Sequence, residues 1–182
     1  MEFTGERAIP KEMAENDITL LEHLARYNFA IPYCRDKKVL DAACGAGYGT
    51  QMIKAVKGVD ISEEAIEYAE ENYPCSEYEV CDLEKDSPVG KFDVVVSFET
   101  IEHLENPHYF LKKVAENSNL FVFSLPLNNS SSFHKQVYNL EQAKNLISDY
   151  FNQIEWYQQE GTEISPLKKE STFLIGIASN NK

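Results

Sequence analysis

The sequence is poor in positive charge. Its 182 residues include 17 lysines and arginines but 30 aspartates and glutamates, which gives a formal net charge of −13. Proteins that hold nucleic acid depend on basic side chains that contact the phosphates. The composition therefore disfavours nucleic acid, or any other long polyanion, as a partner.

Long apolar runs are also missing. The apolar stretches, such as NLFVFSL at 119–125, extend over only a few residues, whereas a helix that spans a bilayer needs about 20. The opening MEFTGERAIP has neither the basic start nor the apolar core of a secretory signal. The sequence therefore predicts no membrane span and a cytoplasmic location.

Paired cysteines are absent as well. The four cysteines, at positions 34, 44, 75 and 81, form no CxxC pair, although zinc sites and redox motifs commonly use that spacing. We therefore expect reduced, buried or half-buried thiols and no cysteine zinc site.

What is present is an alternation of strand and helix patterns, which predicts one α/β domain over residues 1–182. A helical segment within 1–36, with its helix at about 11–33, precedes a core at 37–182. Strands are predicted at 37–42, 56–61, 78–83, 92–98, 119–125, 152–158 and 171–179, and core helices at 48–55, 62–73, 106–118 and 140–150. The last two strands have no long helix between them, so they must run antiparallel. The sheet should be parallel except at that edge.

Three glycines follow the first predicted strand in VLDAACGAGYG, at 39–49. Gly45, Gly47 and Gly49 lie where this strand turns into a helix. A dinucleotide fingerprint would need glycine at position 50, which is threonine here. Glycine still lets the backbone approach a ligand closely, and Asp60, at the end of the second strand, is of the kind that binds ribose hydroxyls. Together these features predict an adenosine-containing ligand at the carboxyl ends of the strands.

Four motifs in order at the ends of successive strands strengthen this prediction. They are DAACGAGYG at 41–49, VDIS at 59–62, CDL at 81–83 and FDVVVSFETIEHL at 92–104. In this order they resemble the class I S-adenosylmethionine-dependent methyltransferases. The stretches FTGERAIP and HLARYNFA further resemble a bacterial subgroup associated with glycans and polysaccharides. The resemblance implies a Rossmann-like three-layer sandwich, with seven mostly parallel strands and an antiparallel final strand.

The resemblance also implies a residue set for the cofactor, S-adenosylmethionine. The methionine part would lie on the turn after the first strand, with Asp41 orienting its amino group, and Asp60 would bind the ribose. The adenine would lie against Ile61, with Asp82 accepting from its amino group and the backbone of Leu83 facing the ring. The full implied set is Tyr27, Asp41, Ala43, Gly45, Gly47, Asp60, Ile61, Asp82, Leu83, Ser97 and Phe98.

The N-terminal segment is expected to close this site. Tyr27 and the pair Glu6 and Arg7 are the candidate residues. Core packing for Tyr27 and a surface ion pair for Arg7 are equally good interpretations.

Candidate catalytic residues follow the fourth strand. An aliphatic hydroxyl acceptor needs a base or a metal to take up or weaken its proton. Glu99, Glu102 and His103 are spaced i, i+3 and i+4, which would place them on one face of a helical turn. His103 is the natural base, and His134, in the loop after the fifth strand, can reach the same rim. The alternatives are a solvated turn for the glutamates and a structural histidine; His23 and His108 are better explained as structural.

These four residues fit two mechanisms. Glu99, Glu102, His103 and His134 could hold a divalent ion, or a carboxylate could orient a histidine base without metal. A metal requires His134 within ligand distance of His103, and its loop, SSSFHK at 130–135, is expected to be flexible. The sequence therefore favours the metal-free base, and it leaves the identity of any metal unknown.

Departures from the resembled family bear on the acceptor. The usual Lys-Pro-Gly-Gly turn before the fifth strand is replaced by AENSN at 115–119, and no large insertion follows that strand. We expect an open acceptor site, and O-methylation of a sugar hydroxyl or a small metabolite. The alternatives are an RNA 3′-end ribose methyltransferase, which the ExxEH pattern resembles, and a cofactor-binding module without turnover. A nicotinamide-dependent oxidoreductase is disfavoured by Thr50. The oligomeric state stays open.

Overall fold

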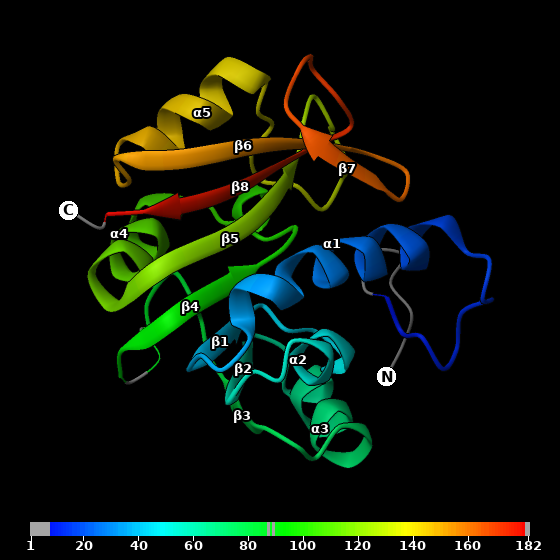
Figure 1. Ribbon diagram of the computed structural model, residues 1–182. Coiled ribbons are helices and arrows are strands. Elements are labelled where there is room, and N and C mark those ends of the chain that lie inside the picture. The colour runs from blue at the N-terminus through cyan, green and yellow to red at the C-terminus, as the bar shows by residue number, and fades with distance from the viewer. Residues whose placement is uncertain (1–7, 87, 89, 181–182) are drawn as a thin grey trace.

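The computed structural model describes residues 8–86, 88 and 90–180, which form a three-layer α/β/α arrangement around one sheet (Figure 1). The helices are α1 (Ile18–Cys34), α2 (Tyr48–Met52), α3 (Glu63–Asn72), α4 (Pro107–Asn117) and α5 (Leu140–Ser148), with a 3₁₀ turn, η1 (Ile101–His103), after the fourth strand. The strands are β1 (Val39–Ala42), β2 (Lys57–Asp60), β3 (Glu77–Val80), β4 (Phe92–Ser97), β5 (Ser118–Pro126), β6 (Gln153–Glu160), β7 (Glu163–Pro166) and β8 (Phe173–Ser179). The predicted α/β class is confirmed.

The sheet has the order β3-β2-β1-β4-β5-β8-β6-β7. Strands β3, β2, β1, β4 and β5 pair in parallel, whereas β8 runs antiparallel between β5 and β6. The antiparallel relation of the two closing strands is therefore as predicted. The order reverses between β1 and β4, and a ligand site is expected outside the carboxyl ends of strands at such a point.

The sheet contains eight strands where the sequence predicts seven. The additional strand, β7, forms a short antiparallel hairpin with β6, with Glu160 opposite Glu163. The turn between them contains Gly161 with a φ of 55°, a conformation that L side chains rarely adopt. The strand is only four residues long and lacks a continuous apolar run, which explains why its sequence gave no clear strand signal.

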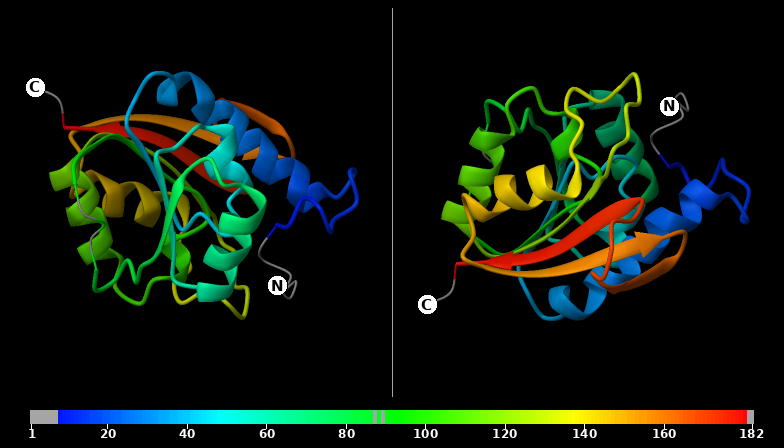
Figure 2. Two further views of the ribbon diagram at one scale, coloured as in Figure 1. Left: turned by 90° about the horizontal axis from the view of Figure 1, so that it is seen from below. Right: turned by 90° about the horizontal axis from the view of Figure 1, so that it is seen from above.

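Each face of the sheet is covered by its own apolar cluster. Helices α4 and α5 cover one face, where the stacked rings of Phe121, Phe123 and Phe151 form the centre of the cluster. Helix α1 covers the other face, as the two views of Figure 2 show. Strand β4 serves both clusters, because Val94 and Val96 pack under α1 while Val95 packs toward α4.

Helix α1 begins at Ile18, seven residues later than the sequence predicts. Asp17 caps it by accepting a hydrogen bond from the backbone N–H of Leu20, and the helix continues past Pro32 to Cys34. Its buried Arg26 donates from Nη1 to Oε1 of Gln159 on β6 at 3.0 Å, and the Gln159 amide donates to the carbonyl of Glu22. These contacts join the first helix to a strand more than 130 residues later.

Two absences predicted from composition can be compared with the structure. None of the described helices is both long and apolar enough to cross a bilayer. All four cysteines are free, and Cys34, Cys44 and Cys81 are buried while Cys75 is exposed. The expected burial thus holds for three of the cysteines and is wrong for Cys75, which follows the end of α3 in the exposed connection to β3.

Candidate active site

A cavity of about 360 Å³ opens at the carboxyl ends of the parallel strands. Its walls come from the turn after β1, the ends of β2 and β3, the segment after β4, and α1. The described lining residues are Ala8, His23, Tyr27, Ala43, Cys44, Gly45, Ala46, Tyr48, Asp60, Ile61, Asp82, Leu83, Glu84, Phe98, Glu99, Thr100, His103 and Leu104. The cavity therefore lies where the strand order reverses, as the fold predicts.

Two glycines between β1 and the first turn of α2 are required by close packing. Gly47 has a φ of 83°, and a Cβ there would lie 2.6 Å from the Cβ of Ala69 on α3. A Cβ on Gly49 would lie 1.9 Å from the ring of Tyr27, so α1 can approach α2 only over a glycine. The glycine pattern thus shapes the cavity wall from behind, whereas Gly45 alone of the three lines the cavity among the described residues.

Asp60 ties two walls of the cavity together. Its Oδ2 accepts a hydrogen bond from the backbone N–H of Gly45, and its Oδ1 accepts one from Ser62, both at 2.9 Å. Ser62 independently caps α3 by accepting from Ala65. Asp60 is therefore not the helix cap, and its carboxylate stays at the cavity surface.

Asp41 is fully buried behind the cavity and does not line it. Its carboxylate accepts hydrogen bonds from the hydroxyls of Tyr27, at 3.3 Å, and Thr50, at 2.7 Å. Burial raises the pKa of Asp41 to about 7, against the lowering effect of these two donors. Thr50, the residue that breaks the dinucleotide fingerprint, thus has a defined role as a donor to Asp41.

Most of the cofactor-binding residues expected from the sequence share this cavity. Eight of the eleven line it: Tyr27, Ala43, Gly45, Asp60, Ile61, Asp82, Leu83 and Phe98. Asp41, Gly47 and Ser97 lie behind the lining, and the Ser97 hydroxyl donates to Thr100 at 2.9 Å. Glu6 and Arg7 lie outside the described residues. The geometry thus gives Asp41, Gly47 and Ser97 supporting positions rather than direct contact.

His23 lies in the cavity wall, although the sequence favoured a structural role for it. Its Nδ1 is 3.0 Å from the Tyr48 hydroxyl. Burial, followed by the charge of Arg26, lowers the pKa of His23 to about 3, so the ring is neutral at ordinary pH. Its position in a helical pattern, one turn before Tyr27, was the only sequence signal that could have placed it beside the cofactor residues.

The segment after β4 differs from the predicted helical turn. Glu99 has a φ of 49° and precedes η1, so it does not share a helix face with Glu102 and His103. Its carboxylate accepts from the Ser124 hydroxyl at 2.6 Å, and its backbone N–H donates back to that hydroxyl. Glu99 and His103 still line the cavity, whereas Glu102 is buried beneath it.

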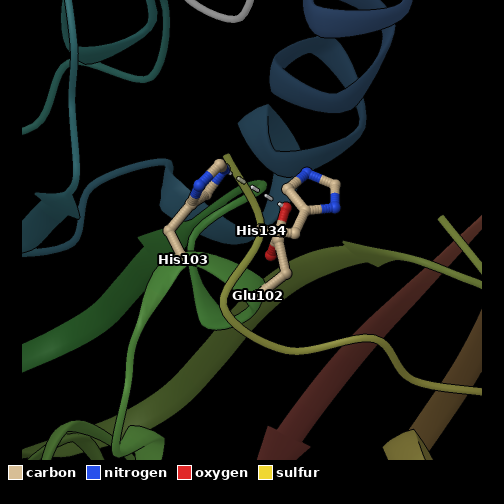
Figure 3. Close-up of side chains that lie close together, drawn as sticks. All are labelled: Glu102, His103 and His134. Carbon is tan, nitrogen blue, oxygen red and sulfur yellow. Dashed lines mark ion pairs between the residues drawn. The ribbon is translucent and has the colours of Figure 1, made fainter. Parts of the chain in front are cut away.

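Glu102, His103 and His134 form a compact cluster at the edge of the cavity (Figure 3). One ligand atom from each lies within 4.8 Å of the others, and His103 Nε2 is 3.8 Å from Glu102 Oε1. The two imidazole rings meet edge to face, with centroids 4.9 Å apart. Glu99 is not part of this cluster. Of the four candidate metal ligands predicted from the sequence, the structure therefore brings three together.

The loop that carries His134, which the sequence predicted to be flexible, is hydrogen-bonded to η1. The backbone N–H groups of Lys135 and Gln136 both donate to the carbonyl of Glu102, at 2.8 and 3.0 Å. At its far end the loop is closed by a hydrogen bond from Asn128 to the carbonyl of Tyr138. These contacts hold His134 over η1. The sequence predicted this proximity only because the fourth and fifth strands are neighbours in the sheet.

Part of the chain is similar in sequence to known proteins. Residues 40–116, which carry the glycine turn, Asp60 and the segment after β4, match a family model described as a methyltransferase domain. A protein of Mycobacterium tuberculosis named as a probable S-adenosylmethionine-dependent methyltransferase is 32% identical over 164 residues. That match covers 81% of this chain and 60% of the relative, so the chain spans less than two thirds of that protein.

Two further similarities extend the comparison. A ubiquinone biosynthesis O-methyltransferase of Coxiella burnetii is 32% identical over 94 residues, covering 44% of this chain and 38% of that one. The crystal structure of the N-methyltransferase NodS from Bradyrhizobium japonicum superposes with a TM-score of 0.74 at 16% identity, covering 93% and 100% of the two chains. Residues 40–116 thus carry the sequence pattern of a methyltransferase domain, and the chain shares the fold of solved methyltransferases.

Proposed function

We propose that the chain transfers a methyl group from S-adenosylmethionine to a hydroxyl of a small neutral acceptor, such as a sugar or a metabolite. The observation that supports this most is Asp60, whose carboxylate stays at the surface of the cavity while bridging Gly45 and Ser62. A carboxylate in this position at the end of the second strand suits the two hydroxyls of a ribose.

The charge of the cavity supports the same cofactor and limits the acceptor. The described lining contains the carboxylates of Asp60, Asp82, Glu84 and Glu99 but no lysine or arginine. Such a surface suits a cationic sulfonium and disfavours a phosphate group. An acceptor with a neutral hydroxyl is therefore a better fit than a nucleic-acid end or a nucleotide.

The residues around the cavity would have separate roles in cofactor binding and in methyl transfer. Bound S-adenosylmethionine would supply an electrophilic methyl group on its sulfonium. The turn at Ala43 and Gly45 would hold the methionine part, and Ile61 would cover the adenine. The rings of Tyr27 and Phe98 meet edge to face, with their centroids 5.1 Å apart. They would exclude water at the reacting centre. His103, which also lines the cavity, would assist removal of the acceptor proton, with Glu102 as its positioning residue.

Calorimetry and a transfer assay test this proposal together. We expect S-adenosylmethionine to bind in the micromolar range, roughly −8 kcal/mol, with no comparable heat from NAD. Labelled cofactor should then methylate members of a panel of sugars, nucleotide sugars and hydroxylated metabolites. Binding of NAD alone would exclude the proposal, and binding without transfer to any hydroxyl, amine or RNA end would support the module without turnover.

The pKa of Asp41 predicts a pH dependence of cofactor binding. Burial raises this pKa to about 7, and the positive charges of the cofactor favour the ionised carboxylate. Binding at lower pH must therefore release a proton from Asp41, so the affinity should fall by roughly fivefold to tenfold between pH 7.5 and pH 6. Calorimetry in buffers of different ionisation enthalpy would measure both the affinity and the proton release.

The matched control for this dependence is Asp41→Asn, which keeps the shape of the side chain without its titration. The charged and titratable groups near Asp41 are Tyr27, Tyr48, Tyr78, Cys34, Cys44 and Asp60. The variant should bind with nearly constant affinity over this pH range. If its affinity falls as steeply as that of the parent protein, another group carries the dependence.

A further inference from the structure

We propose that Glu102, His103 and His134 bind a divalent transition-metal ion at the edge of the cavity. The cluster offers one carboxylate oxygen and two imidazole nitrogens, all within 4.8 Å of one another. This donor set suits Mn²⁺, Co²⁺, Fe²⁺ or Zn²⁺ better than Ca²⁺ or Mg²⁺, which prefer oxygen ligands alone.

The hydrogen bonds of both histidines fix the ring nitrogen that can bind metal. Nδ1 of His103 lies 3.2 Å from the carbonyl of Phe133, and Nδ1 of His134 lies 3.0 Å from the carbonyl of Asn129. A carbonyl oxygen only accepts, so both Nδ1 atoms must carry the hydrogen. With the hydrogen on Nδ1, Nε2 is the nitrogen of each ring that can act as a metal ligand. Metal-binding histidines typically donate their other N–H in this way.

The separation between the ligand atoms of Glu102 and His103 also fits a shared cation. Nε2 of His103 lies 3.8 Å from Oε1 of Glu102, which is too long for a hydrogen bond. Two ligands at about 2.1 Å from one ion lie roughly 3.0–4.2 Å apart. A positive ion between a lone pair and a carboxylate oxygen is attracted to both atoms.

The ligands are held by elements that do not depend on the ion. Glu102 and His103 belong to η1, while the His134 loop is bonded through Lys135 and Gln136 to the carbonyl of Glu102. Glu102 is 1% exposed, whereas His103 opens onto the cavity. The ion would therefore have protein on one side and open positions toward the acceptor.

The role of the ion rests on the proposed methyl transfer, although its binding does not. An ion held here would lower the pKa of a hydroxyl bound to it. The acceptor O–H proton passes to solvent and an oxygen lone pair forms the new C–O bond. The C–S bond breaks with its electron pair remaining on sulfur, which becomes a neutral thioether. The sequence favoured a metal-free base because the His134 loop was expected to be flexible, whereas the anchored loop favours the metal.

The first test measures metal binding to the full chain without cofactor or acceptor. Protein freed of metal by dialysis against a chelator is titrated with Mn²⁺, and free Mn²⁺ is followed by electron paramagnetic resonance. We expect one ion per chain, and a Co²⁺ titration should give the visible absorption of a site with nitrogen ligands. No stoichiometric binding of Mn²⁺, Co²⁺ or Zn²⁺ up to millimolar concentration would overturn the proposal.

Variants then identify the ligands. His134→Ala and Glu102→Gln should weaken Mn²⁺ binding at least tenfold. Two control variants should bind Mn²⁺ as the parent does. His108→Ala removes an imidazole on α4 that is hydrogen-bonded to Tyr150, and Glu99→Gln changes a carboxylate that accepts from Ser124. Circular dichroism checks folding, and the Co²⁺ spectrum of the parent tests the nitrogen ligands if Glu102→Gln unfolds. Unchanged affinity in folded His134→Ala would contradict the site.

A third measurement separates this inference from the proposed function. With an acceptor in hand, chelation should abolish methyl transfer and added Mn²⁺ or Co²⁺ should restore it, while cofactor affinity stays constant. Transfer that survives removal of all metal would overturn the catalytic role and return His103 to a metal-free base. Stoichiometric metal binding without any methyl transfer would leave the site in place and overturn the proposed function instead.

Discussion

Replacing His103 with alanine is expected to lower turnover by about a hundredfold or more. His103 lines the cavity, and in the proposed reaction its loss would remove proton transfer or a metal ligand from the transition state. It has no assigned contact with the cofactor, so calorimetry should find S-adenosylmethionine affinity nearly unchanged. Steady-state rates with a methylated acceptor, measured beside that affinity, would show an effect on kcat rather than on binding.

The matched control for His103→Ala is His108→Ala. His108 is exposed on α4, where its Nδ1 lies 2.7 Å from the Tyr150 hydroxyl, and it is not among the residues that line the cavity. Its replacement should leave the rate within a factor of two or three of the parent. A His103→Ala protein as active as this control would make His103 a structural residue.

Asp60→Ala is expected to weaken cofactor binding by about 1.5–3 kcal/mol, because hydrogen bonds to a charged acceptor contribute in this range. That loss corresponds to roughly a tenfold to 150-fold rise in the dissociation constant. Calorimetry measures it directly. Unchanged affinity would mean that Asp60 only bridges the loops.

Two comparisons separate ribose binding from the bridging role of Asp60. Asp60→Asn keeps an oxygen that can accept from Gly45 or Ser62, so it should retain more of the thermal stability than Asp60→Ala while still binding the cofactor more weakly. Asp149→Ala removes an exposed carboxylate at the end of α5 and should alter neither property. Equal losses of affinity and stability in both Asp60 variants would assign the effect to the loop.

The parts of the fold that the sequence predicted are those with a strong periodic signal. The sequence of β4 is a nearly continuous apolar run, because both faces of this strand are covered. The start of α3 is indicated by its cap, Ser62, and by two glutamates in its first turn. Strand β7 could not be predicted, because a four-residue edge strand is defined by its pairing with β6 rather than by its own sequence.

The candidate site likewise contains residues whose positions the sequence predicted and residues whose positions it did not. Gly45 and Asp60 lie at or just after strand ends, and both line the cavity at the end of the sheet where the sequence predicted a ligand. Glu99 was misplaced because its spacing from Glu102 suggested a helix, whereas its left-handed backbone and its bond to Ser124 depend on a neighbouring strand. The approach of His134 to His103 likewise depends on backbone hydrogen bonds between two loops, which side-chain spacing does not encode.

The hydrogen bond between Arg26 and Gln159 can form only after β6 has been synthesised. Helix α1 leaves the ribosome first, but the strand that receives its buried guanidinium comes more than 130 residues later, and contacts so distant in sequence form late. Since α1 supplies His23 and Tyr27 to the cavity wall, a nascent chain that lacks β6 should not be able to retain the cofactor. Ribosome-stalled chains of increasing length should therefore acquire cofactor binding only after β6 has emerged.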